Sequence, residues 1–270
     1  MPSFSCAKSE CDSRRTRSTR EESERLLEGG EKIIQMNLSE VMDYLESKGS
    51  EQTRKIYKNH GSPDNFFGVK VGDMKPIQKK EKNNHSLALE LFDTGNGDAQ
   101  YLAGLIADPK QFTKIEFKQW AKNAGWYMIS EYAVAWNLAE SPLCMEICSE
   151  WIKSSDEKLQ ECAWAAMSAH LGITPDENID KAYHTALIDH VENNIHSAPN
   201  RVRYCMNGYI IALGGAVSEL TERCKQAGVA IGKVHVLMGE TSCKVPDIKT
   251  YISKMEDKNR IGKKKKTAKC

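Results

Sequence analysis

The chain has 270 residues and a formal net charge of +1. This length can bury a sizeable hydrophobic core. The near-neutral charge excludes a globally basic protein, so any nucleic-acid surface must come from local segregation of charge. No apolar run is long enough to span a bilayer, and the N-terminal segment lacks the apolar core of a signal peptide. We therefore expect no membrane partner and a cytoplasmic location, associated with the nucleoid, or a nuclear one in a eukaryotic cell.

Nine cysteines raise two further classes, a disulfide-stapled domain and a metal protein. A disulfide framework is excluded because the chain is long and carries no secretion signal. Cys144 and Cys148 share a helix face, but no nearby Cys or His completes a zinc site. P-loop, GxGxxG and HExxH motifs do not occur either. The sequence thus predicts small buried thiols, with no metal and no organic cofactor.

The first part of the chain divides into a tail and a series of helices. Residues 1–36 are polar, mix arginines with glutamates, and are predicted to be a disordered tail. An ordered helical domain is expected over residues 37–255. Its first helix ends at Gly49, a typical C-terminal glycine, and Ser50 is a suitable N-cap for the second.

Two of the following helices carry their lysines along one stripe. The first is expected to be capped by Asp73 and to tolerate Pro76 in its first turn. The second opens with a capping box from Thr113 to Glu116. Such a stripe is either a solvated helix face or part of a shared basic surface, and two stripes on successive elements favour the shared surface. The lysines are Lys75, Lys79 and Lys82 on the first helix and Lys114, Lys118 and Lys122 on the second.

Residues 87–171 are the centre of the pattern. Apolar residues recur there at steps of three and four, and short Gly-, Pro- and Ser-containing breaks separate segments of similar length. The segments 98–107, 160–171 and 201–213 share large apolar side chains with small residues between them. Helices of similar length joined by tight turns indicate an all-α fold, a HEAT-like repeat α-solenoid with a concave surface.

Later segments add candidate site residues. A helix predicted over residues 126–139 places Trp126 and Ser130 on one face, with Glu131 about 140° from Trp126 at 100° per residue. Another helix, over 200–215, carries Arg201 and Arg203 at its start, where they either contact phosphate or pair with acidic neighbours. Gly208 in its middle costs about 1 kcal/mol relative to alanine, which suggests close packing there.

The end of the chain departs from this helical pattern. Residues 231–246 have strand character and are predicted to form an extended or hairpin-like excursion. Residues 256–270 are predicted to be a disordered basic tail that adds non-specific affinity for nucleic acid.

Two stretches read together resemble the AlkD-type DNA alkylation-repair family. They are TRKIYKNHG followed by FGVKVGDMKPIQKK, and HSLALELFDTGNGDAQYLAGLIADP before the Gly-Trp helix. The likeness covers roughly residues 40–230. It implies a HEAT-like α-solenoid whose basic concave face cradles duplex DNA. It also implies a glycosylase that releases positively charged N3- or N7-alkylated purines without flipping the base. Because such a purine is already a good leaving group, a carboxylate or an aromatic face beside the sugar suffices to stabilise the oxocarbenium-like transition state.

The family pattern of two tryptophans, one aspartate and one arginine is only partly kept. Trp126 matches the first tryptophan. Ser130 stands where the aspartate is expected, and a carboxylate follows one position later at Glu131. The arginine position falls near Glu161, a reversal of charge. The second tryptophan falls at Gly208-Tyr209, where Tyr209 would keep an aromatic face.

Three hypotheses follow from this pattern. The first is an alkylpurine DNA glycosylase that acts as a monomer on alkylated duplex DNA. Its catalytic candidates are Trp126, Ser130, Glu131 and Tyr209, and both lysine stripes with Arg201 and Arg203 contact the DNA. The second is a catalytically silent relative that binds DNA or unusual DNA structures. The third is a solenoid that binds protein partners. For Trp126 and Tyr209, a structural role as aromatic residues of the hydrophobic core is an equally good interpretation.

Overall fold

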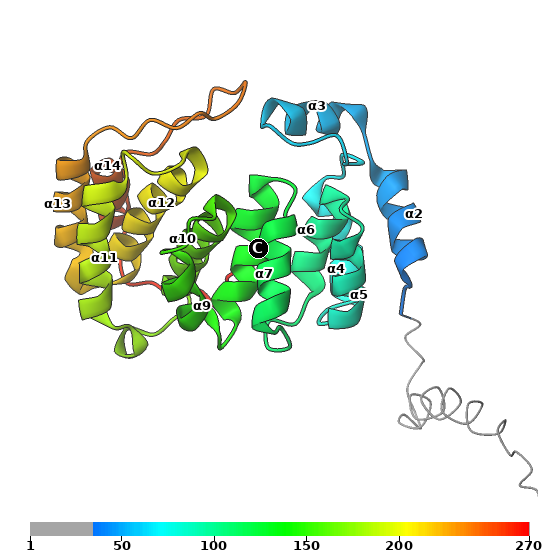
Figure 1. Cartoon of the computed structure of the whole chain (residues 1–270), viewed down its shortest axis with the longest axis horizontal. Helices are drawn as coiled ribbons and strands as arrows, with labels where there is room; N and C mark the ends of the chain where they lie inside the picture. Colours follow the sequence, from blue (N-terminus) through cyan, green and yellow to red (C-terminus); the bar gives the residue numbers. More distant parts are fainter. Residues whose placement is uncertain (1–34, 270) are drawn as a thin grey trace, which may run out of the picture. The chain divides into compact units, whose positions relative to one another are not determined.

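The computed structural model of the protein describes residues 35–269, and within that range it contains helices and no strand (Figure 1). Residues Met36–Cys270 form one compact unit. The predicted N-terminal tail lies outside the described residues except at its last two positions. The helices of the first half are α2 (Leu38–Lys48), α3 (Glu51–Asn59), α4 (Val71–Lys80), α5 (His85–Asp93), α6 (Gly97–Ile106), α7 (Lys114–Asn123), the π-helix η1 (Ile129–Val134) and α8 (Ala135–Glu140). Those of the second half are α9 (Cys144–Trp151), α10 (Glu157–Leu171), the 3-10 turn η2 (Asp176–Asn178), α11 (Lys181–Asn194), α12 (Asn200–Ala216), the 3-10 turn η3 (Ser218–Leu220), α13 (Thr221–Ile231) and α14 (Ile248–Asp257).

From α5 onward the helices of this unit alternate between two layers (Figure 1). α6, the η1–α8 segment, α10 and α12 pack side by side in an inner layer, and α14 packs against α12. α5, α7, α9, α11 and α13 pack on these inner helices from the other side. This succession of helix pairs confirms the predicted all-α repeat fold. No helix among residues 35–269 is long and apolar enough to cross a bilayer.

Local capping signals define three helix ends as the sequence predicts. Gly49 is the C-cap of α2, the Ser50 side chain caps α3, and Thr113 forms a complete capping box in α7. The expected start of α4 is wrong, because the helix begins at Val71 after a Lys70 N-cap without a side-chain cap bond. Pro76 therefore lies inside the helix rather than in its first turn.

Small and aromatic side chains fill the core between the layers. Phe92 and Trp120 stack with ring centroids 4.0 Å apart, which joins α5 to α7. The thiols follow the prediction of small buried groups, since five cysteines are buried and only Cys243 is exposed among those described. Gly104 on α6 allows a close approach to η1, because a Cβ there would lie 2.5 Å from the Cβ of Ala133.

The basic segment after α14 is bound along the ends of the inner helices instead of forming the expected free tail. Lys264 Nζ donates to Leu171 O at 3.0 Å and to Ala216 O at 2.8 Å, at the last residues of α10 and α12. Lys269 Nζ donates to Ala107 O, just after α6, at 2.7 Å. Helix C-termini carry unpaired carbonyls and the negative end of the helix dipole, so lysine ammonium groups are well placed there.

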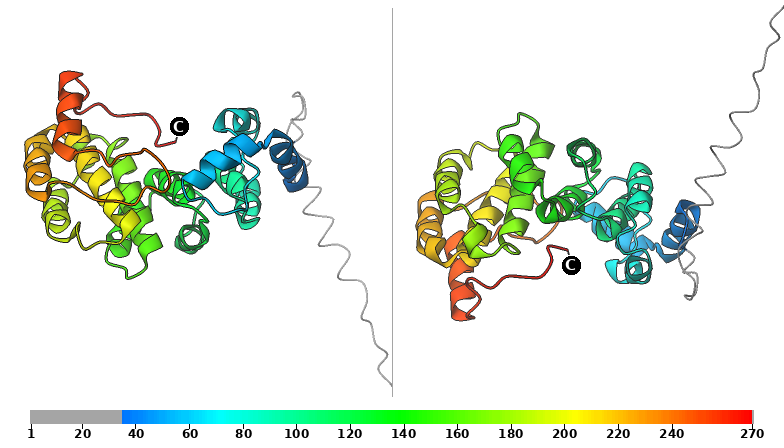
Figure 2. Two further views of the ribbon diagram at one scale, coloured as in Figure 1. Left: turned by 90° about the horizontal axis from the view of Figure 1, so that it is seen from above. Right: turned by 90° about the horizontal axis from the view of Figure 1, so that it is seen from below.

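Backbone contacts complete the attachment of this segment. The Lys265 N–H donates to Gly172 O at 2.8 Å, and the Ala268 N–H donates to Glu140 Oε1 at 2.6 Å. Burial lowers the pKa of Lys269 to about 8. The segment lies on the side of the inner layer away from α9 and α11 (Figure 2). Lys264 and Lys269 of this tail thus bind carbonyls at helix ends of the same protein, which composition alone does not reveal.

Replacing Lys264 with methionine tests this attachment. Lys264→Met keeps the chain length but removes the ammonium group that binds two helix ends and lies 2.9 Å from Asp176 Oδ1. Hydrogen bonds to charged groups contribute about 1.5–3 kcal/mol, so we expect a loss of about 2 kcal/mol in the free energy of unfolding measured in urea. Lys266→Met, at an exposed position of the same segment, is the matched control. Equal stability of the two variants would contradict the role of Lys264.

The segment between α13 and α14 is extended but contains no regular strand. Asn200 holds this segment by two hydrogen bonds. Its Nδ2 donates to Leu237 O at 3.0 Å, and the Leu237 N–H donates to Asn200 Oδ1 at 2.8 Å. Its tip reaches α3, where the Glu240 N–H donates to Asn59 O at 2.9 Å. The predicted excursion is therefore present, and it joins the start of α12 to the end of α3 (Figure 1).

Candidate nucleic-acid interface

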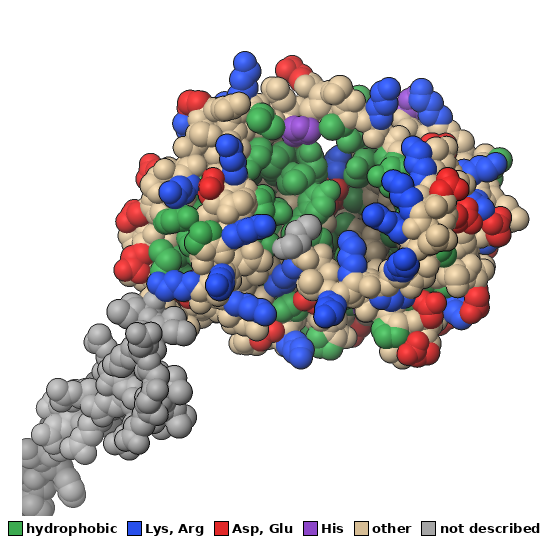
Figure 3. Space-filling model, turned by 180° about the vertical axis from the view of Figure 1, so that it is seen from behind, with side chains coloured by type: hydrophobic (Ala, Val, Ile, Leu, Met, Phe, Trp, Pro, Cys, Tyr) green, Lys and Arg blue, Asp and Glu red, His purple; other side chains and the backbone are tan. Residues whose placement is uncertain are grey.

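One face of the protein combines positive charge with a hollow. On the face in Figure 3, Lys and Arg side chains surround a depression whose floor is largely hydrophobic. Asp and Glu side chains gather mainly toward the outer margin of this face. A near-neutral chain thus separates its charges locally, as nucleic-acid binding requires.

A π-helical segment shapes the inner layer at the predicted catalytic residues. Residues 129–134 form η1 where the sequence predicts a regular helix over 126–139. A π-helix is paired i to i+5 and often occurs at functional sites. Because its turn is wider, the 140° angle between Trp126 and Glu131 on an ideal α-helix does not apply. Asn137 ties this segment to α6, since its Nδ2 donates to Gly104 O at 2.8 Å and to Ala133 O at 2.7 Å.

The Glu131 carboxylate is paired with Arg201 of α12. Arg201 Nε donates to Glu131 Oε1 at 2.7 Å, and the Arg201 NH2 group bonds the same oxygen. The guanidinium carbon lies 3.9 Å from the ring centroid of Tyr127 and 4.4 Å from that of Tyr204. Stacking between aromatic faces suits the planar, weakly hydrated guanidinium. Burial raises the pKa of Glu131, and the Arg201 charge opposes that shift by favouring the ionised form.

A second carboxyl, Glu161 of α10, lies near this ion pair. Its side chain is buried, and its Oε1 has no hydrogen-bond partner among the described residues. Burial, followed by the Glu131 charge, raises the pKa of Glu161 to about 8, while Arg201 and the Ser130 hydroxyl act in the opposite direction. Glu161 is therefore largely protonated at neutral pH. In its neutral form Glu161 carries no negative charge that would repel a phosphate.

The two predicted catalytic aromatics lie in the core. Trp126 is 9% exposed, its indole N–H donates to His60 O at 3.0 Å, and its ring packs on Phe66. Tyr209 is 0% exposed, and its hydroxyl lies 2.6 Å from His184 Nδ1. Trp126 and Tyr209 therefore fit the alternative interpretation, in which both are aromatic residues of the hydrophobic core. Ser130 is buried as well, beside Glu161.

The lysines predicted to bind DNA fall into two groups. On α7, Lys114 pairs with Glu146 and Lys122 with Asp156, so the helix of the outer layer uses two of its lysines to bind the next repeat. Salt bridges at such exposed positions contribute little to stability. The other four predicted lysines are exposed and have no ion pair among residues 35–269: Lys75, Lys79, Lys82 and Lys118.

The two predicted arginines also make internal contacts. Arg201 pairs with an acidic residue, which is the second of the two roles that its sequence position suggests. Arg203 donates to His235 O at 2.8 Å and to Ala198 O at 2.9 Å, which holds the segment between α13 and α14 against α12. Both arginines therefore bond groups inside the protein.

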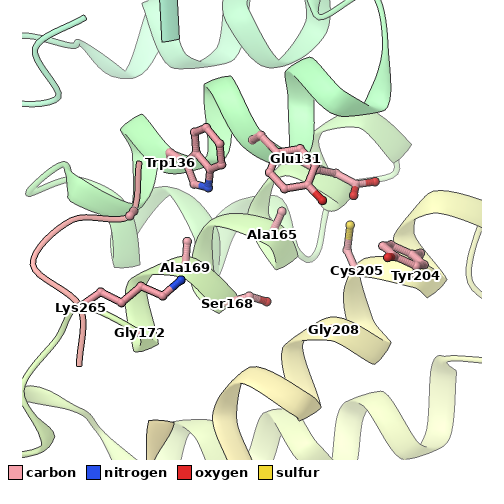
Figure 4. A pocket seen from close by; sticks show the side chains of 12 residues that line it. Glu131, Trp136, Ala165, Ser168, Ala169, Gly172, Tyr204, Cys205, Gly208 and Lys265 are labelled. Atoms are coloured by element: carbon pink, nitrogen blue, oxygen red, sulfur yellow. The ribbon is translucent and has the colours of Figure 1, made fainter. Parts of the chain in front are cut away.

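A pocket of about 270 Å³ opens beside the ion pair, between η1–α8, α10, α12 and the C-terminal segment (Figure 4). Gly208 lines it, and a Cβ added there would meet nothing within 4 Å. The close packing predicted at this glycine is thus wrong, because the position faces open space. The sequence signal that marks the pocket is the mid-helix glycine itself, since a ligand approaching the backbone explains it as well as packing does. Glu131, Trp136, Tyr204 and Lys265 also border the pocket.

Comparisons with known proteins agree with this architecture. A family model described as "DNA alkylation repair enzyme" matches residues 41–223. An uncharacterized protein of Listeria innocua is 33% identical over 220 residues, covering 79% of this chain and 95% of that protein. An uncharacterized protein of Listeria monocytogenes is 31% identical over 222 residues, covering 80% of this chain and 96% of that protein.

A solved structure is similar over its whole length. It has a TM-score of 0.81 and 35% sequence identity, and the match covers 87% of this chain and 100% of that one. It is described as representing a new family of proteins related to the HEAT-like repeat DNA glycosylases with affinity for branched DNA structures. The fold is therefore a HEAT-like repeat array, as expected. The chain belongs to the DNA alkylation repair enzyme family.

Proposed function

We propose that this protein binds DNA through the hollow face of Figure 3, prefers branched DNA to linear duplex, and does not excise bases. The observation that carries the binding proposal is the ring of Lys and Arg side chains around the hollow. The affinity for branched DNA described for the structure that is 35% identical supports the choice of ligand.

The absence of excision is inferred from the state of the carboxylates. An oxocarbenium-like transition state is stabilised by a preorganised negative charge or an aromatic face at the sugar, and the predicted aromatics Trp126 and Tyr209 lie in the core. Glu131 is instead buried and neutralised by Arg201, which lies between two tyrosine rings. Glu161 is largely protonated at neutral pH. Neither carboxyl therefore offers a free charge to a substrate in this arrangement.

The binding proposal is tested with a four-way junction and a linear duplex of equal length and sequence content. We expect the junction to bind about tenfold more tightly. Both affinities are expected to fall as salt rises, because phosphate contacts release counterions. Fluorescence anisotropy at several salt concentrations measures both quantities. Equal affinity for the two DNAs would contradict the preference, and no binding at low salt would contradict the DNA-binding function.

A second candidate is the alkylpurine glycosylase that the family resemblance suggests. The observation that favours it is the carboxylate of Glu131 at the edge of a pocket on the inner layer. If DNA displaced Arg201 onto a phosphate, Glu131 would become available beside the sugar. This candidate predicts release of 7-methylguanine that depends on Glu131.

A further inference from the structure

We propose that the pocket beside Gly208 receives one unpaired nucleobase from branched DNA (Figure 4). This inference rests on the proposed binding of branched DNA and names the part of that ligand which the pocket recognises. Gly208, Ser168, Trp136, Tyr204, Glu131 and Lys265 carry the argument.

The size and the lining of the pocket suit a single ring. α12 contributes Gly208, and α10 contributes Ala165, Ser168 and Ala169, so short side chains border the space on both helices. Nothing lies within 4 Å of a Cβ built on Gly208, which leaves the backbone of α12 open to a ligand. The volume of about 270 Å³ is just below the roughly 300–1,000 Å³ of pockets for drug-sized ligands. A single base is the right class of ligand for this size.

The lining supplies the contacts that a base and its phosphate need. Trp136 and Tyr204 lie on opposite sides of the pocket, and aromatic side chains bind bases of any sequence by stacking (Figure 4). The Glu131 carboxylate, which Arg201 bonds through Oε1 and the Cys205 thiol also bonds, borders the pocket and can accept a hydrogen bond from an exocyclic amino group. Lys265 is exposed, and its ammonium group has no partner among residues 35–269, so it is available to a phosphate.

Branched DNA supplies such a base more readily than duplex DNA does. A base in a duplex must be unpaired and unstacked before it enters a pocket, and this costs less at a branch point, where stacking is interrupted, and least where the base there is unpaired. The pocket therefore adds binding energy for branched DNA that a linear duplex cannot use. This gives the proposed preference for branched DNA a physical origin beyond general electrostatics.

The test uses a three-way junction with one unpaired adenosine at the branch point and a second junction with an abasic residue there. We expect the wild type to bind the adenosine junction about tenfold more tightly than the abasic one. Gly208→Trp fills the pocket and is expected to bind both junctions equally. Gly208→Ala adds only a methyl group, and Gln119→Trp adds the same ring at an exposed position of α7, so both should keep the tenfold difference.

Two results would overturn the inference while the proposed function stands. One is equal binding of the two junctions by the wild type, a measurement that does not depend on the folding of any variant. The other is a tenfold difference that persists in folded Gly208→Trp. If the wild type binds neither junction, the proposed function fails and the base pocket fails with it.

Discussion

Replacing Arg201 with methionine is expected to lower the free energy of unfolding by about 3–5 kcal/mol at pH 7. The substitution keeps much of the side-chain volume but leaves Glu131 buried without its cation. Removing one partner of a buried ion pair has effects of this size, because the remaining charge is uncompensated. The stacking of the guanidinium on Tyr127 and Tyr204 is lost as well. Urea unfolding monitored by circular dichroism measures the change.

The pH dependence and a neighbouring variant make this prediction specific. Without Arg201, the already raised pKa of Glu131 rises further, so its charge destabilises the fold above that pKa and protonation relieves the effect at lower pH. The deficit of Arg201→Met should therefore shrink as the pH falls toward 5. Arg203→Met on the same helix loses only bonds to backbone carbonyls and serves as the control. Equal losses for the two variants, with no pH dependence, would contradict the role of the ion pair.

Replacing Glu161 with glutamine is expected to stabilise the protein at pH 8. The pKa of Glu161 is about 8 in the folded protein and 4.5 ordinarily, so the folded state holds a proton that the unfolded state releases. The contribution of this group to the free energy of unfolding is fully present below pH 4.5. It declines as the pH rises to about 8 and is constant above that. Each pH unit in that window contributes about 1.4 kcal/mol, which gives an upper bound of about 5 kcal/mol.

Glu161→Gln keeps the shape of the side chain and cannot ionise, so its stability curve should be flatter between pH 5 and 8 than that of the wild type. The two proteins should be equally stable near pH 4.5. At pH 8 the free energy of unfolding of Glu161→Gln should exceed that of the wild type by about 2–5 kcal/mol. Glu157→Gln, at an exposed position of the same helix, should leave the pH profile unchanged. A stability difference between the wild type and Glu161→Gln that stays constant between pH 5 and 8 would contradict the raised pKa of Glu161.

Features that depend on a single helix were predictable from the sequence. The C-cap at Gly49, the N-cap at Ser50 and the capping box at Thr113 are local, and all three occur as predicted. The repeat fold followed from apolar periodicity, and the family followed from two sequence motifs. Such signals require only that neighbouring residues share a helix turn.

The candidate site was less predictable because its contacts join distant repeats. Glu131 and Arg201 are 70 positions apart, and helical periodicity gives no information about which partner lies opposite. The π-helical turn that carries Glu131 has no signature in the hydrophobic pattern. Lys264 reaches helix ends formed by Leu171 and Ala216, so a segment that is basic in composition becomes structural through tertiary contacts.

The most direct test of binding without excision is base release from methylated DNA. Wild-type protein is incubated with duplex and junction DNA that contain 7-methylguanine and 3-methyladenine, under conditions in which binding is saturated. We expect no release above the spontaneous rate, because Glu131 is held by Arg201. Release by the wild type that falls in Glu131→Gln would contradict this account and identify Glu131 as a catalytic carboxylate.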